Sequence, residues 1–141
     1  MNYTRLGLAA LGGMVASFAF GFLVFWLVPA LINEGHKYEA VFRPKEDMNT
    51  VMPVGIGATF ISVLIAAIIF AMIHPGGSGA KEGAIFGVLM GAFVVFAFVL
   101  HNYVNLNIGF KLALGQAAAY FVQWTIVGIV IGLIYKPLAR P

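Results

Sequence analysis

Long apolar runs alternate with short polar segments along this chain. A helix needs about 20 apolar residues to cross a bilayer. Four runs meet this requirement, at about 6–32, 51–73, 83–103 and 110–135. The connection at 33–50 is hydrophilic and long, whereas the other connections are short. We therefore predict a single all-α membrane domain over residues 1–141, a polytopic bundle of four transmembrane helices.

Proline, glycine and polar residues indicate where these helices end. Pro29 lacks an N–H group and is expected to kink the first helix near its end. Asn49 or Thr50 can cap the second helix, with Pro53 tolerated in its first turn. The stretch from His74 through Gly79, which reads His-Pro-Gly-Gly-Ser-Gly, predicts the turn that follows it.

Composition strengthens the membrane prediction and narrows the function classes. The chain is 62% hydrophobic and 9% charged, against roughly 25% charged residues in soluble domains. A net charge of +3 without a dense basic patch argues against nucleic-acid binding. The absence of cysteine excludes disulfides and thiolate metal sites within the chain. Four spans leave no room for a soluble catalytic domain, and no carboxylate lies inside a predicted span. We expect no enzymatic activity and name no catalytic residue.

Small residues recur at four-residue spacing on all four predicted helices, which puts them on one face of each helix. On the second helix they are Ala58, Ser62 and Ala66. Such stripes, of which GxxxG is the simplest, let a neighbouring helix backbone approach closely. We expect helix packing to use Gly13, Ser17, Gly21, Gly83, Gly87, Gly91, Gly128 and Gly132.

A second pattern is polar and lies where the third helix ends and the fourth begins. Polar groups in a bilayer must find partners, so they are expected to point inward. We predict a hydrogen-bonded seam that fixes helix register, with a small-ligand site or a polar path as alternatives. Its residues are His101, Asn102, Asn105, Gln116, Tyr120 and Gln123.

The histidines constrain cofactor binding, and the sequence leaves the cofactor unknown, with none as the first expectation. His74 and His101 fall at opposite membrane faces, about 30 Å apart across the hydrocarbon, so they cannot ligate one haem. His101 alone as an axial ligand of haem or a chlorophyll-type pigment is the alternative. His36 and Glu39 have one-turn spacing, but two ligands do not make a metal site, so we predict a solvated loop and no metal.

The last hairpin resembles that of small uncharacterised bacterial four-helix membrane proteins. The resemblance rests on the His-Asn-Tyr-Val-Asn segment that starts at His101 and on the Gln-Trp-Thr-Ile-Val-Gly segment that ends at Gly128. It implies a bacterial inner-membrane protein of four helices and carries no activity with it. Four spans put both termini on one side, and Lys and Arg divide four against four between the sides. We expect the termini in the cytoplasm.

These observations favour a structural or accessory membrane subunit, embedded in lipid, that packs against itself or against other subunits of a larger membrane complex. The first alternative is a transporter or channel-like protein for a small or lipophilic solute. The second is a haem- or pigment-binding protein that uses His101.

Overall fold

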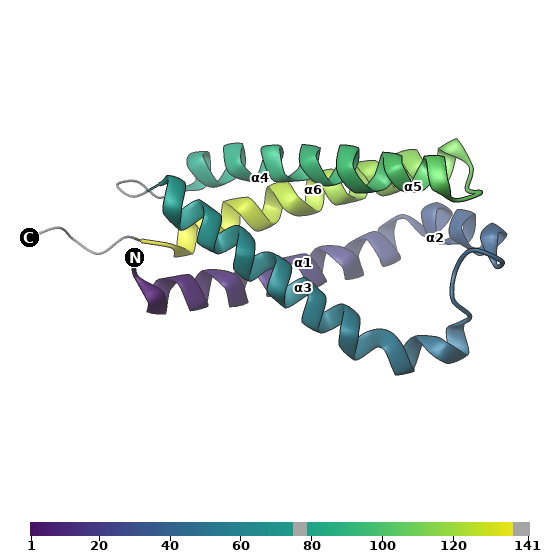
Figure 1. Cartoon of the computed structure of the whole chain (residues 1–141), viewed down its shortest axis with the longest axis horizontal. Coiled ribbons are helices and arrows are strands. Elements are labelled where there is room, and N and C mark those ends of the chain that lie inside the picture. The colour runs from purple at the N-terminus through teal and green to yellow at the C-terminus, as the bar shows by residue number, and fades with distance from the viewer. Residues whose placement is uncertain (75–78, 137–141) are drawn as a thin grey trace, which may run out of the picture.

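The computed structural model of the chain describes residues 1–74 and 79–136, and within them it contains helices and connecting turns without a β-strand (Figure 1). The turn predicted at 75–78 lies outside the described residues. The elements are α1 (Tyr3–Leu27), α2 (Pro29–Gly35), η1 (His36–Tyr38), α3 (Lys45–Ile73), α4 (Ala80–Val94), η2 (Val95–Val99), α5 (Leu100–Asn105) and α6 (Phe110–Ile134).

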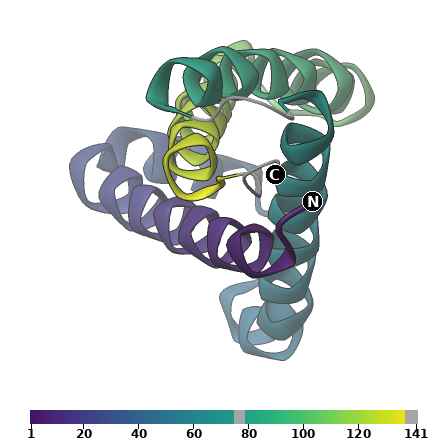
Figure 2. The same ribbon diagram turned by 90° about the vertical axis from the view of Figure 1, so that its left-hand side faces the viewer.

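Four helical stretches are long and apolar enough to cross a membrane, which confirms the predicted fold class. They are Tyr3–Leu27, Glu46–Ile73, Ala80–Asn105 and Phe110–Ile134. α6 is the central helix, with α4 on one side and α1 on the other (Figure 2). α3 crosses α1 obliquely, and α1 begins at the end of the bundle where α6 ends (Figure 1).

α4 and α6 form the closest helix pair because glycines remove the side chains between them. A Cβ atom added to Gly87 would lie 2.6 Å from the Trp124 carbonyl oxygen, and one added to Gly91 would lie 2.9 Å from the Phe121 carbonyl oxygen. From the other side, a Cβ on Gly128 would lie 2.5 Å from the Gly87 Cα. The two backbones therefore pack directly on each other, as small residues allow in membrane helices.

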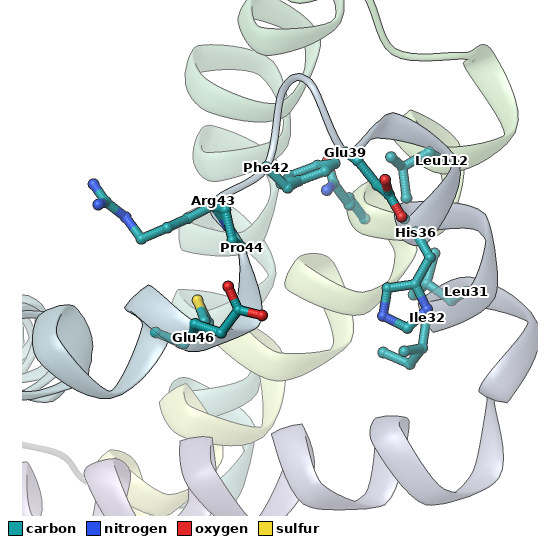
Figure 3. A pocket seen from close by; sticks show the side chains of 12 residues that line it. Leu31, Ile32, His36, Glu39, Phe42, Arg43, Pro44, Glu46 and Leu112 are labelled. Atoms are coloured by element: carbon teal, nitrogen blue, oxygen red, sulfur yellow. The ribbon is translucent and has the colours of Figure 1, made fainter.

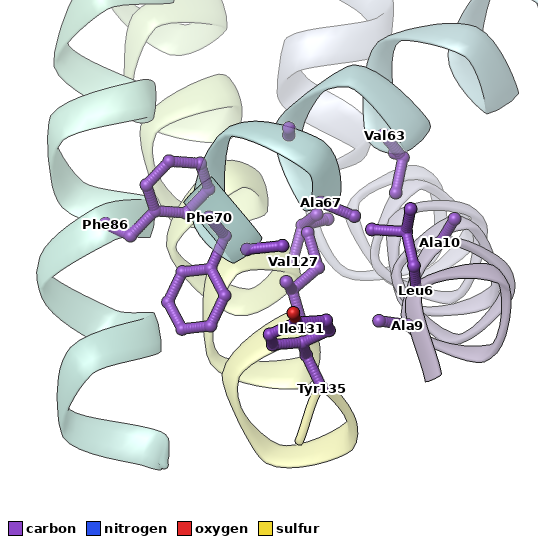
Figure 4. Close-up of a cluster of buried hydrophobic side chains, with 12 residues drawn as sticks. Leu6, Ala9, Ala10, Val63, Ala67, Phe70, Phe86, Val127, Ile131 and Tyr135 are labelled. Atoms are coloured by element: carbon purple, nitrogen blue, oxygen red, sulfur yellow. The ribbon is translucent and has the colours of Figure 1, made fainter. Parts of the chain in front are cut away.

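The main core lies at the end of the bundle that holds the N-terminus (Figure 4). Phe70 of α3 is its centre, fully buried and in edge-to-face contact with Phe86 and Tyr135, at ring-centroid distances of 5.4 and 6.2 Å. Alanines on α1 and α3 let these two helices approach, since Ala9, Ala66 and others have no exposed surface.

α3 leaves the bundle along its first half. Its buried residues all lie between Val63 and Ala71, and none of residues 46–62 is buried. At that end of the molecule a second, smaller core holds Ile108, Leu112 and Ala113 against Leu31, Tyr38 and Val41. This second core joins α2 and η1 to α6 and does not include α3.

Two predicted boundaries are wrong. The first helix does not run to residue 32: it ends at Leu27, Val28 adopts a non-helical conformation (φ −125°, ψ 58°), and Pro29 starts α2. A helix accommodates proline without losing a hydrogen bond only in its first turn. The chain therefore ends one helix before Pro29 and starts another there, where a kink was predicted.

The second helix starts at Lys45 instead of 51, which shortens the predicted loop 33–50. Glu46 and Asp47 occupy its first turn, where carboxylates favour the positive end of the helix dipole. Asn49 and Thr50 are therefore not caps, and Pro53 lies inside the helix.

The third span runs from Ala80 to Asn105, a few residues beyond the predicted 83–103 at each end, and contains the π-helical turn η2 between α4 and α5. Residues at four-residue spacing drift by about 40° per step around an α-helix. A π turn contains one residue more than an α-helical turn. The residues that follow it are therefore rotated back towards the face on which the glycines lie. Val99, which continues the spacing of Gly83, Gly87 and Gly91, is fully buried as a result.

Candidate functional site

The polar residues predicted to form one seam are divided in the structure. Gln116 lines a cavity near the end of the bundle, and Tyr120 and Gln123 line a second cavity deeper along α6. His101 and Asn105 are exposed on α5, Asn102 is half-buried, and none of the three lines either cavity. The seam is therefore confined to α6 and its neighbours α1 and α3.

The deeper cavity has a volume of about 460 Å³ and lies between α1, α3, η2 and α6. Most of its polar groups have partners within the protein. Gln123 Nε2 donates to Ser17 Oγ at 2.7 Å and to the Ser17 carbonyl at 3.2 Å. Thr59 and Ser62 donate to carbonyls of their own helix at 2.9 and 2.8 Å, as hydroxyls in membrane helices commonly do.

An aromatic pair closes one side of this deeper cavity. The Phe98 ring of η2 packs edge-to-face on the Tyr120 ring, with centroids 6.1 Å apart. The π turn thus supplies a side chain to the cavity wall, a contribution that no pattern in the sequence predicted. π turns inside α-helices recur at functional positions in proteins.

The larger cavity, about 770 Å³, opens at the end of the bundle opposite the N-terminus (Figure 3). It lies between α2, the connection that follows η1, the start of α3 and the start of α6. Its apolar lining comprises Leu31, Ile32, Phe42, Pro44, Met48 and Leu112, and its polar lining comprises His36, Glu39, Arg43, Glu46 and Gln116.

Both cavities lie along one face of α6. Leu112 and Gln116 line the first cavity, and Tyr120, Gln123 and Val127 line the second, at successive spacings of four, four, three and four residues. α3 contributes Met48 to the first cavity and Ser62 to the second. α3 therefore contributes to the walls of both cavities, which lie one after the other along α6.

Glu34 connects α2, which lines the larger cavity, to α6. Its side chain is only 9% exposed, and its Oε2 accepts a hydrogen bond from Lys37 Nζ at 2.9 Å, while Lys111 Nζ of α6 lies 3.5 Å away. The Lys37 hydrogen bond holds the pKa of Glu34 below its usual value, against desolvation, and the charges of Lys37 and Lys111 add to this. The same bond raises the pKa of Lys37.

Our sequence reasoning did not single out Glu34. The available signal was a carboxylate directly after an apolar run, with a lysine one turn later. Lys111 could not be connected to Glu34, because the two residues are 77 positions apart along the chain.

Within the described residues, no three His, Asp or Glu side chains gather closely enough to hold a metal ion. His36 and Glu39 do line the same cavity. His74 stacks on Phe70 with ring centroids 4.4 Å apart.

The small residues predicted to pack helices have different surroundings. Gly83, Gly87, Gly91, Gly128 and Gly132 lie between α4 and α6, and a Cβ on Gly13 would lie 2.7 Å from Val63 Cγ1 of α3. Ser17 holds Gln123, as described above. Gly21 is exposed, with no atom within 4 Å of an added Cβ.

Comparison of the chain with protein-family models, with curated proteins and with solved structures finds no match. The function must therefore be argued from the geometry of the chain, and the resemblance of the last hairpin to small bacterial four-helix proteins stays a prediction.

Proposed function

We propose that the protein is a non-enzymatic structural or accessory membrane protein of a bacterial inner membrane. In this proposal it associates with a second copy of itself through the first half of α3. The observation that carries this proposal is the absence of any buried residue in 46–62, although this half-helix belongs to a candidate span. A partner in the bilayer would supply the packing that the rest of the chain does not.

The residues of this half-helix suit contact with protein. Gly55 and Gly57 are exposed, and an added Cβ would meet nothing within 4 Å at either position. Glycine weakens a helix that gains nothing from it, by about 0.5–1 kcal/mol relative to alanine. In membrane helices glycines are useful where another backbone approaches, as Gly87 and Gly128 demonstrate within this chain.

The glycines of α4 and α6 are used against each other, and Gly13 packs against α3. Exposed glycines with no neighbour within 4 Å of an added Cβ remain on α1, at Gly7 and Gly21, and in the first half of α3, at Gly55 and Gly57. We propose α3 as the association surface because its first half has no buried residue. In a symmetric dimer, equivalent residues near the two-fold axis face each other.

Cysteine cross-linking tests this proposal directly, because the chain has no cysteine of its own. Gly57→Cys should give a disulfide-linked dimer on oxidation in native membranes. Leu89→Cys, on an exposed position of α4, is the matched control and should stay monomeric. Gly57→Leu should then abolish dimers in mild detergent. A monomer at every concentration, or equal cross-linking at both positions, would contradict the proposal.

The two cavities along α6 favour a second candidate function, which is the binding or passage of a small amphipathic solute. Their volumes, about 770 and 460 Å³, fall within the range of small-molecule sites. The larger cavity lies at one end of the candidate spans, where solutes that partition between water and lipid would accumulate.

A further inference from the structure

We infer that the larger cavity binds an organic cation with an apolar body. This inference rests on the second candidate function and gives its substrate class, and it does not depend on self-association through α3. It follows from three properties of the cavity: the sign of the charges at its rim, the chemistry of its floor and its position in the bilayer.

The rim carries two exposed carboxylates, and neither forms an ion pair within the described part of the chain. Glu39 and Glu46 approach the cavity from opposite sides, one after η1 and the other in the first turn of α3, and both are exposed (Figure 3). Arg43 also belongs to the lining, but its guanidinium group extends away from the cavity in Figure 3. These orientations favour a cation between the carboxylates and disfavour an anion there.

The neighbouring acid and two bases carry one net positive charge between them, and they lie outside the lining of the cavity. Glu34 is held by Lys37 and Lys111, and none of the three lines the cavity. Glu39 and Glu46 make no ion pair with another described residue. Their charges are therefore available to a ligand.

The apolar residues that line the cavity favour a ligand with an apolar body over a fully hydrated ion. Leu31, Ile32 and Leu112 present aliphatic surface, and Phe42 places an aromatic ring next to Glu39 (Figure 3). Covering such surface is worth about 25 cal/mol per Å² to an apolar group. An aromatic face adds attraction for a cation, and more so for one that is weakly hydrated.

The position of the cavity fits the same ligand. It lies where α1 has ended and α3 and α6 begin, so its rim is at one end of the spans, and its lining on α6 reaches Gln116. An amphipathic cation could keep its charge at the carboxylates and its apolar body against α6. Gln116, one turn from Leu112, then offers an amide at the inner end of the cavity.

The test uses two probes of matched shape and opposite charge, tetraphenylphosphonium and tetraphenylborate. Binding of each is measured by equilibrium dialysis to the full chain in nanodiscs, with empty nanodiscs subtracted to remove partitioning into lipid. We expect saturable binding of tetraphenylphosphonium and none of tetraphenylborate. The double variant Glu39→Gln/Glu46→Gln should weaken the cation about tenfold, the order expected for two partly screened charges.

Two further variants keep the result interpretable. Glu82→Gln removes a carboxylate from the first turn of α4, which does not line the cavity, and should leave binding unchanged. Phe42→Leu keeps the apolar surface and removes the ring, and should weaken the cation about threefold. Unchanged helicity and elution volume of each variant show that it is folded.

The outcomes separate this inference from the proposal beneath it. Equal binding of both probes, insensitive to the Glu39 and Glu46 substitutions, would overturn cation selectivity while supporting a solute-binding cavity. Failure of both probes to bind the wild-type chain would overturn the inference and count against solute handling as well. Neither result bears on dimer formation, which the cysteine experiment reports separately.

Discussion

Gln123 of α6 donates hydrogen bonds to both the hydroxyl and the carbonyl oxygen of Ser17 on α1, 106 positions earlier in the chain. In a bilayer neither group can turn to water, so each depends on the other or on its own helix. Gln123→Leu should lower the free energy of unfolding by about 1 kcal/mol, in the range measured for polar contacts between membrane helices.

Unfolding by titration with SDS, followed by circular dichroism, measures this change. Thr59→Val is the control, because Thr59 donates to a carbonyl of its own helix and links no two spans. A Gln123 variant as stable as the wild type would show that the contact contributes only to helix register.

The glycine contact between α4 and α6 leads to a sharper prediction. Gly87→Ala places a Cβ 2.6 Å from the Trp124 carbonyl oxygen, and backbone cannot yield as a side chain can. We expect a loss of about 1–3 kcal/mol, as for other overpacked cores, measured by the same SDS titration.

Gly21→Ala is the matched control on α1, where an added Cβ meets nothing. It should leave stability unchanged or raise it by up to about 1 kcal/mol, since alanine favours the helix. Similar destabilisation by both substitutions would contradict the close α4–α6 contact.

The ion pair at Glu34 predicts how pH affects the joint between α2 and α6. The pKa of Glu34 is lowered from 4.5 in the folded chain, so its contribution is present above pH 4.5 and is lost as the pH falls through the lowered value. The pKa of Lys37 is raised from 10.5, so its contribution is present below pH 10.5 and is lost as the pH rises through the raised value.

Hydrogen exchange of the α2 amides should therefore be slowest between these limits, after correction for the intrinsic pH dependence of exchange. Glu34→Gln should remove the acid-side loss and weaken protection at neutral pH. Glu39→Gln, in the same connection and without an ion pair to a described residue, should keep the wild-type profile. An unchanged profile in Glu34→Gln would show that the joint depends on its apolar contacts alone.

Membrane orientation is accessible through single cysteines in this cysteine-free chain. Thr4→Cys and Lys136→Cys lie at one end of the bundle, and Asn107→Cys lies at the other. If the termini face the cytoplasm, an impermeant maleimide added to intact cells should label only Asn107→Cys. Labelling of the first two instead would reverse the expected orientation.

The four spans could be predicted because hydrophobic length alone identifies them, and the glycine spacing of α4 and α6 anticipated a close contact. Helix ends were less predictable. At Pro29 a break replaced the expected kink, and favourable charges at Glu46 and Asp47 accompany a start of α3 six residues before the apolar run. Such ends depend on local balances of about 1 kcal/mol, which hydropathy does not represent.

The site was less predictable than the fold. His101 was expected beside Gln116, but η2 precedes it, and one extra residue rotates all later side chains by about 100° around the helix. No residue between Val95 and Val99 signals that turn. The divergence of α3, which contributes to the walls of both cavities, depends on how four helices cross and is invisible to any pattern within one of them.

The central place of α6 has a consequence for biosynthesis. α6 emerges from the ribosome after the other three described spans, and it packs against both α1 and α4. Until it inserts, the glycine face of α4 borders lipid and Ser17 has no amide to accept from. The earlier spans are therefore incompletely packed until α6 inserts. A chain truncated before Phe110 should be degraded by quality-control proteases and should not accumulate.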